Sequence, residues 1–133
     1  MKRVIFLVLV LFVGLGTMAV GQTVKFSFCK SYCGKQWKLT ATEEFGVEGD
    51  PEENMQKDEA FFGEDGKVKI TLFGKMIEGK WTIDNTQTYI TVSNEKTKEK
   101  TFLKVIQTDN PAEMTLEFKD TNLVKTKMIY EKK

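Results

Sequence analysis

The sequence predicts an all-β fold, an eight-stranded antiparallel up-and-down barrel that follows a signal peptide and a short N-terminal helix. From residue 36 onward apolar residues alternate with polar ones, the period of strands that bury one face. Turn-forming residues interrupt this alternation roughly every eight to twelve residues. No helical pattern is long enough to cover the sheet, so the strands must close on one another or fold over as a β-sandwich, the alternative architecture.

The N-terminus predicts a secretory signal peptide over residues 1–21. Two cations lead into an apolar run over residues 4–20, and the small residues Ala19 and Gly21 close it. Cleavage leaves residues 22–133 as one exported domain, periplasmic or secreted. The alternative is an uncut membrane anchor, although the run is at the short limit for spanning a bilayer. Otherwise we expect no contact with a membrane.

Residues 25–35 are the predicted short helix, and they carry both cysteines. Cys29 and Cys33 are four apart, on one helical face and within disulfide reach. In an oxidising compartment we expect a local structural disulfide, with buried thiols or a redox pair as alternatives. Cys29 lies too far beyond the apolar run to accept the lipid of a bacterial lipoprotein.

Eight strands are predicted, and the turn residues between them set their ends. Asp65-Gly66 favours a tight hairpin after the second strand, and Gly74-Lys75 turns the chain after the third. Pro111 cannot donate to a ladder, so it follows the end of the sixth. The expected strands cover residues 36–45, 59–63, 67–73, 76–84, 88–93, 101–108, 112–119 and 123–131.

Alternation along these strands predicts the side chains that face the interior. Trp37 and Trp81 are expected to close the end of the core. Glu43 shares the inward parity of the first strand and would need a lysine or tyrosine partner. The aromatic residues either leave a cavity or fill it, and the small size of the domain favours filling. The predicted cavity wall and ligand-binding set is Trp37, Leu39, Glu43, Phe45, Val68, Ile70, Leu72, Trp81, Leu103, Leu116, Met128 and Tyr130.

An acidic loop at residues 46–59 joins the first two strands and is expected to lie over one mouth of the barrel. It carries six carboxylates, but it lacks the alternation and fixed glycine of a calcium loop, so we expect a solvated loop and no metal site. A loop of this length can serve as a lid, with Met55 pointing inward.

Missing residue types exclude several kinds of chemistry. The sequence has no histidine, and its one arginine, Arg3, falls in the signal peptide, so histidine-dependent catalysis is excluded. Glu43 and Glu44 are adjacent and would point to opposite faces of a strand, unlike a glycosidase pair. Because lysines and acidic residues nearly balance, nucleic acid is not an expected partner. We expect no enzyme activity and no cofactor.

Three motifs in order resemble the small bacterial lipocalin-like domains, many of them from secreted proteins of Bacteroidetes. They are Trp-x-Leu at Trp37, Phe-x-x-Asp-Gly at Phe62, and Gly-x-Trp-x-Ile at Gly79. The resemblance covers nearly all of residues 22–133. It implies an exported lipocalin-type barrel, a small-molecule cavity and no enzyme activity, and it does not imply a particular ligand.

The chain also departs from the lipocalin pattern. True lipocalins begin with Gly-x-Trp and pack a late arginine over that tryptophan, whereas this chain has Gly34-x-x-Trp37 and only Lys125 or Lys127 to offer a cation–π contact. Fatty-acid-binding relatives hold a carboxylate with arginine and tyrosine, and only Tyr130 matches.

The sequence therefore predicts an exported barrel that binds a small hydrophobic or amphipathic molecule. The alternative is a non-catalytic structural or protein-interaction module, for instance an inhibitor, with a filled barrel. Neither hypothesis identifies a protein partner.

Overall fold

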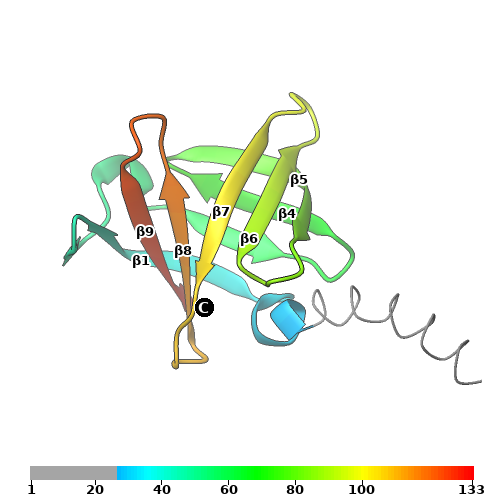
Figure 1. The fold of residues 1–133 in the computed structure, drawn as a ribbon, viewed down its shortest axis with the longest axis horizontal. Coiled ribbons are helices and arrows are strands. Elements are labelled where there is room, and N and C mark those ends of the chain that lie inside the picture. The colour runs from blue at the N-terminus through cyan, green and yellow to red at the C-terminus, as the bar shows by residue number, and fades with distance from the viewer. Residues whose placement is uncertain (1–26) are drawn as a thin grey trace, which may run out of the picture.

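Nine strands follow a short lead-in helix (residues 27–32) in the computed structural model, which describes residues 27–133 (Figure 1). The predicted signal peptide lies outside the described residues. Within them, no helix is long and apolar enough to cross a membrane. The elements are β1 (Gln36–Glu44), β2 (Val47–Gly49), the 3-10 helix η1 (Glu53–Met55), β3 (Glu59–Phe62), β4 (Lys67–Leu72), β5 (Lys75–Ile83), β6 (Tyr89–Asn94), β7 (Lys100–Ile106), β8 (Glu113–Lys119) and β9 (Lys125–Lys132).

The strands form a closed antiparallel barrel, which confirms the predicted fold class. Each strand from β3 to β9 pairs with the next, and β1 closes the ring by pairing with β3 on one side and β9 on the other. The extra strand β2 pairs with the end of β1 as a hairpin. The segment predicted as an open acidic loop therefore contains a strand and a 3-10 helix. Closure by β1 and β9 leaves the eight barrel strands without an open edge.

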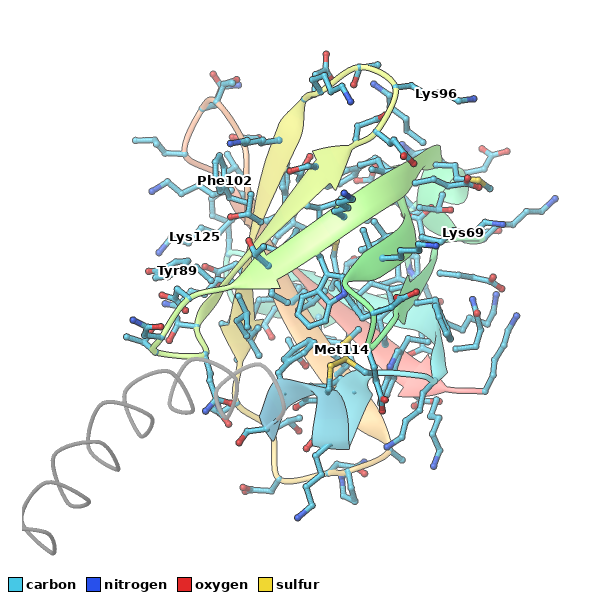
Figure 2. All side chains as sticks on the ribbon, turned by 90° about the vertical axis from the view of Figure 1, so that its right-hand side faces the viewer. Lys69, Tyr89, Lys96, Phe102, Met114 and Lys125 are labelled. Atoms are coloured by element: carbon cyan, nitrogen blue, oxygen red, sulfur yellow. A yellow bond between two sulfur atoms is a disulfide. The ribbon has the colours of Figure 1, made fainter. Side chains whose placement is uncertain are left out.

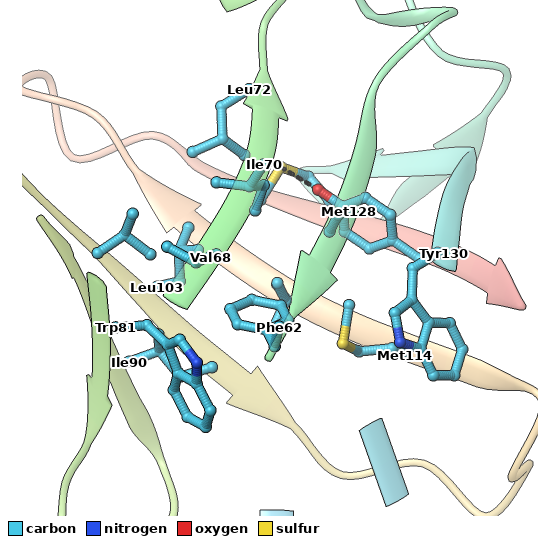
Figure 3. Close-up of a cluster of buried hydrophobic side chains, with 14 of the residues drawn as sticks. Phe62, Val68, Ile70, Leu72, Trp81, Ile90, Leu103, Met114, Met128 and Tyr130 are labelled. Carbon is cyan, nitrogen blue, oxygen red and sulfur yellow. Dashed lines mark hydrogen bonds between the residues drawn. The ribbon is translucent and has the colours of Figure 1, made fainter. Parts of the chain in front are cut away.

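Apolar side chains from opposite walls meet along the axis and fill the barrel (Figure 3). No buried side-chain nitrogen or oxygen among the described residues lacks a hydrogen-bond partner. The interior therefore consists of apolar side chains that water does not reach, as in the core of a globular protein. The largest fully buried side chains are Trp37, Leu39, Phe62, Ile70, Trp81, Ile90, Val92, Leu103, Met114, Leu116, Met128 and Tyr130.

A β-bulge in β1 reverses the faces of its side chains. The register with β9 shifts between Leu39 and Ala41. Beyond the shift, Thr42 and Glu44 stand opposite buried residues of β9 and take the inward positions. Glu44 accepts a hydrogen bond of 2.8 Å from the Thr126 hydroxyl. One extra residue therefore moves the second half of β1 to the opposite parity.

Because of the bulge, the prediction that Glu43 and Phe45 line the cavity wall is wrong. Glu43 lies on the outer side of the barrel, where its carboxylate is 3.8 Å from the Lys127 amine. Phe45 is 84% exposed and has φ 52° in the two-residue turn that it forms with Gly46 between β1 and β2. Neither side chain reaches the interior, because the bulge inserts one residue before them. A prediction from strict alternation does not count that extra residue.

The Gly-x-Trp motif in β5 has a steric basis. A Cβ at Gly79 would lie 1.8 Å from the carbonyl oxygen of Ser93 on β6, so a larger residue cannot fit without moving the strand. Two residues later, the Trp81 main-chain N–H donates to the Gly66 carbonyl at 2.9 Å, and its indole N–H donates to the Gly63 carbonyl at 3.0 Å. The motif thus joins β5 to β6 and to the β3–β4 turn.

Candidate functional site at the barrel mouth

The lead-in helix closes one end of the barrel. The ring of Phe28 packs 5.6 Å from that of Phe62 and 5.2 Å from that of Trp81, measured between ring centroids. The Trp37 indole N–H donates to the Tyr32 carbonyl at 2.9 Å. Both tryptophans are thus held at this end, in the position predicted for residues that plug a barrel. A ligand cannot enter here without displacing the helix.

A disulfide holds the end of this helix. Cys29 and Cys33 are bonded, with Cα atoms 4.2 Å apart, and both are buried. The Cys33 N–H also donates to the Cys29 carbonyl at 3.0 Å, as in a helical turn. The structure therefore contains the predicted local bridge, and its burial at the end of the helix is consistent with a structural role.

The opposite mouth of the barrel holds a small hollow of 160 Å³. Its apolar wall comes from the ends of β4, β5 and β8, and the rings of Phe73 and Phe118 meet there with centroids 5.2 Å apart. Charged and polar groups surround this wall on the solvent side. The lining residues are Leu72, Phe73, Lys75, Ile77, Asn94, Glu99, Thr101 and Phe118. This combination of an apolar floor and a polar rim is what an amphipathic molecule requires.

The structure places most of the predicted wall inside the barrel but not at this hollow. Only Leu72 belongs to both sets. The others contribute to a filled core, and each is at most 5% exposed. They are Trp37, Leu39, Val68, Ile70, Trp81, Leu103, Leu116, Met128 and Tyr130.

Tyr130 illustrates this difference between core and site. It is fully buried, and its hydroxyl donates to the Met128 sulfur at 3.7 Å (Figure 3). Burial, with a smaller contribution from the charge of Asp58, raises the pKa of its hydroxyl far above the ordinary value of 10.0. A carboxylate ligand could reach this hydroxyl only through the packed interior.

Asp58 fixes one side of the mouth. Its buried carboxylate accepts hydrogen bonds from the main-chain N–H groups of Phe73 at 2.8 Å and Gly74 at 3.0 Å. These two residues form the β4–β5 turn with φ 52° and 79°. Burial raises the pKa of Asp58, although the two N–H donors oppose the shift. The carboxylate thus holds the Phe73 ring at the mouth.

The segment between β2 and β3 covers the same side. Met55 in η1 is buried, as expected for a lid side chain. A Cβ at Gly74 would lie 2.8 Å from the Asn54 carbonyl oxygen, so η1 and the β4–β5 turn are in close contact. Sequence reasoning did not identify Asp58, because its contacts with the β4–β5 turn join separate parts of the chain.

Other hollows lie on the outer surface. One of 320 Å³ crosses β6 to β9 beside the exposed rings of Tyr89 and Phe102. Among the described residues, no group of three histidine, cysteine, aspartate or glutamate side chains could hold a metal ion. A scan of protein-family models finds no match to this chain, and a search of curated proteins finds no relative.

Proposed function

We propose that this protein is an exported, non-catalytic barrel of the bacterial lipocalin-like kind that binds the apolar end of a small amphipathic molecule at its mouth. The observation that carries the proposal is the hollow between Phe73 and Phe118, which opens to solvent beside Lys75 and Glu99. Apolar atoms of a ligand would be buried against the rings, while its polar end stays hydrated at the rim.

The dimensions of the hollow define the class of ligand. At 160 Å³ it is smaller than the pockets of about 300–1,000 Å³ that enclose whole drug-sized molecules. An aromatic ring or a short alkyl segment fits this volume, and the remainder of the ligand would lie outside. Because the rest of the barrel is filled, we expect moderate affinity for amphipathic molecules with a compact apolar end.

An NMR titration with anilinonaphthalene sulfonate and a medium-chain fatty acid tests this proposal. The resonances of Phe73, Ile77 and Phe118 should shift saturably, whereas those of the core around Met114 should not. Tryptophan emission is a poor readout because both tryptophans lie at the helix-closed end.

A variant that fills the hollow sharpens the test. Thr101 lines the mouth, so Thr101→Phe should weaken binding at least about tenfold. Thr82 is exposed on the outer face of β5, and Thr82→Phe is the matched control that should bind like the wild type. Absence of shifts with either probe, or unchanged affinity in Thr101→Phe, would refute binding at the mouth.

Core packing also favours a second candidate function, a non-catalytic interaction module with a filled barrel. The same titration separates the two functions: a module of this kind would leave the mouth resonances unchanged and would use its outer face, where several large apolar side chains are exposed.

A further inference from the structure

The outer wall of the barrel carries a second hollow, separate from the mouth. It has a volume of 320 Å³ and spans β6 to β9. Figure 2 shows Tyr89, Phe102 and Lys125 on the same side of the barrel. The residues that matter for its chemistry are Tyr89, Phe102, Lys104, Glu117, Lys119 and Lys125. None of them lines the hollow at the mouth.

Two aromatic rings offer flat apolar surfaces at this hollow. Tyr89 is 53% exposed and Phe102 is 63% exposed, although aromatic side chains are usually buried. They lie on the neighbouring strands β6 and β7 and line the same hollow. A single exposed ring needs no explanation, but two rings around one concavity form a surface on which a planar or ring-shaped ligand can stack.

Three lysines lie close to the two rings. Lys119 of β8 stands directly opposite Lys125 of β9, an arrangement of like charges that destabilises a sheet. Among the described residues, neither of them nor Lys104 makes an ion pair with a carboxylate. The Asp120 carboxylate nearby accepts two N–H groups of its own turn, at 2.8 and 2.9 Å. An anionic group in the hollow would relieve the repulsion between the two lysines.

The outer hollow contains a carboxylate in addition to the two rings and the lysines. Glu117 lies between Lys104 of β7 and Lys127 of β9 in the cross-strand register and lines the hollow. It supplies an acceptor beside the lysine donors, so the site can bind hydroxyl groups as well as an anion. A flat membrane surface rich in anionic lipids would be repelled by Glu117 and would not fit a concavity in the side of the barrel.

We propose that this outer hollow binds an acidic saccharide, a sugar ring that bears a carboxylate or sulfate. The apolar C–H face of the sugar stacks on Tyr89 and Phe102, its anionic group lies between Lys119 and Lys125, and its hydroxyls bond to Glu117 and Lys104. The volume is at the lower end of the range for small-molecule pockets, which fits one or two sugar rings.

Calorimetry and NMR with a galacturonic acid trisaccharide test the proposal. The trisaccharide should shift the resonances of the outer hollow, and raising the ionic strength should weaken its binding. A neutral galactose trisaccharide should bind at least about tenfold more weakly because it lacks the anionic group. Inorganic sulfate and phosphatidylglycerol vesicles are the two other probes, and both should bind more weakly than the acidic trisaccharide.

Matched variants assign the binding to this hollow. Phe102→Ala and Lys125→Gln should each weaken trisaccharide binding about five- to tenfold, because one removes a stacking surface and the other an ammonium group. Phe61→Ala on β3 and Lys96→Gln in the β6–β7 loop remove an exposed ring and an exposed lysine elsewhere, and both should bind like the wild type.

Four results would overturn the proposal. They are no binding of the acidic trisaccharide, equal binding of the neutral one, equal loss in the control variants, and occupation of the hollow by sulfate or vesicles in preference to the saccharide. Because the mouth and the outer hollow share no lining residue, failure here leaves the result of the mouth titration unaffected.

Discussion

The carboxylate of Asp58 stabilises the β4–β5 turn at the mouth of the barrel. A buried carboxylate is unfavourable unless it is hydrogen-bonded, and here it satisfies two N–H groups in a turn with two positive φ angles. Phe73 in that turn needs this support, because a bulky residue rarely adopts the left-handed conformation. The acid thus stabilises a strained turn at the candidate site.

The pKa of Asp58 predicts how stability depends on pH. Burial raises this pKa above its ordinary value of 3.8, so the folded protein binds the proton more tightly than the unfolded chain does. The stabilisation from Asp58 is therefore fully present below 3.8 and is lost as the pH rises through the folded pKa. The free energy of unfolding of the wild type, relative to Asp58→Asn, should therefore fall as the pH is raised above 3.8 in a series of urea titrations.

Asp84 provides a control, because the pH dependence of stability expected from it has the opposite sign. Hydrogen bonds lower the pKa of this half-buried carboxylate, and the bond from the Tyr89 N–H has the largest effect. Its stabilisation is present above the ordinary value of 3.8 and is lost as the pH falls through the lower folded pKa. Stability relative to Asp84→Asn should therefore rise with pH. A difference between wild type and Asp58→Asn that is constant or rises with pH would contradict the account of Asp58.

Gly79 gives a second prediction at the scale of one residue. Its missing side chain lets the Ser93 carbonyl approach to where a Cβ would be 1.8 Å away. Gly79→Ala should reduce the free energy of unfolding by about 3 kcal/mol or more, because β5 and β6 must separate. Gly49→Ala is the control, since open space surrounds that position and little change is expected. Equal effects of the two substitutions in urea denaturation would be inconsistent with the close contact.

Among the elements, the lead-in helix stabilises the barrel by covering one end. Its Phe28 ring contacts Tyr32, Phe62 and Trp81 at centroid distances of 5.0 to 5.6 Å. The disulfide between Cys29 and Cys33 closes a short loop, so its entropic effect on the unfolded chain is modest, about 2 kcal/mol. The packing of Phe28 is thus the larger contribution of this helix.

Phe28→Ala tests this assignment. Removing a buried phenylalanine should lower the free energy of unfolding by about 3–5 kcal/mol, and water reaching Trp81 should shift tryptophan emission to the red. Phe102→Ala removes an exposed ring and should change stability by less than about 1 kcal/mol with no spectral shift. A Phe28→Ala protein with wild-type stability and emission would show that the helix does not cap the barrel.

The elements also show where sequence patterns fail. Alternation located the barrel strands because every one of them buries a single face. It misplaced Glu43 and Phe45 because the bulge after Leu39 leaves no mark in the order of apolar residues. It missed β2 because a phenylalanine is an unusual residue for a turn with positive φ, although Gly46 beside it was a signal.

For the whole molecule, closure of the sheet followed from the sequence by elimination. With no helix to cover eight apolar faces, a barrel was the favoured way to bury them, and the structure has that architecture. The small size of the domain also favoured a filled interior, which the buried side chains now form. Export by the signal peptide stays a prediction.

The candidate sites were less predictable than the fold. The hollow at the mouth unites Leu72, Phe73, Ile77 and Phe118 from three strands and their ends, and its volume depends on how the rings of two distant turns meet. The outer hollow depends on the register that places Lys119 opposite Lys125. Both are properties of packing and pairing, which a single sequence does not encode in any local pattern.

Cross-strand nuclear Overhauser effects between β1 and β9 test most directly the claim that a closed, filled barrel underlies both sites. The account predicts contacts from Leu39 to Tyr130 and from Thr42 to Met128, with the one-residue shift of the bulge between them. An absence of contacts between β1 and β9, or a continuous register that turns Glu43 inward, would contradict it.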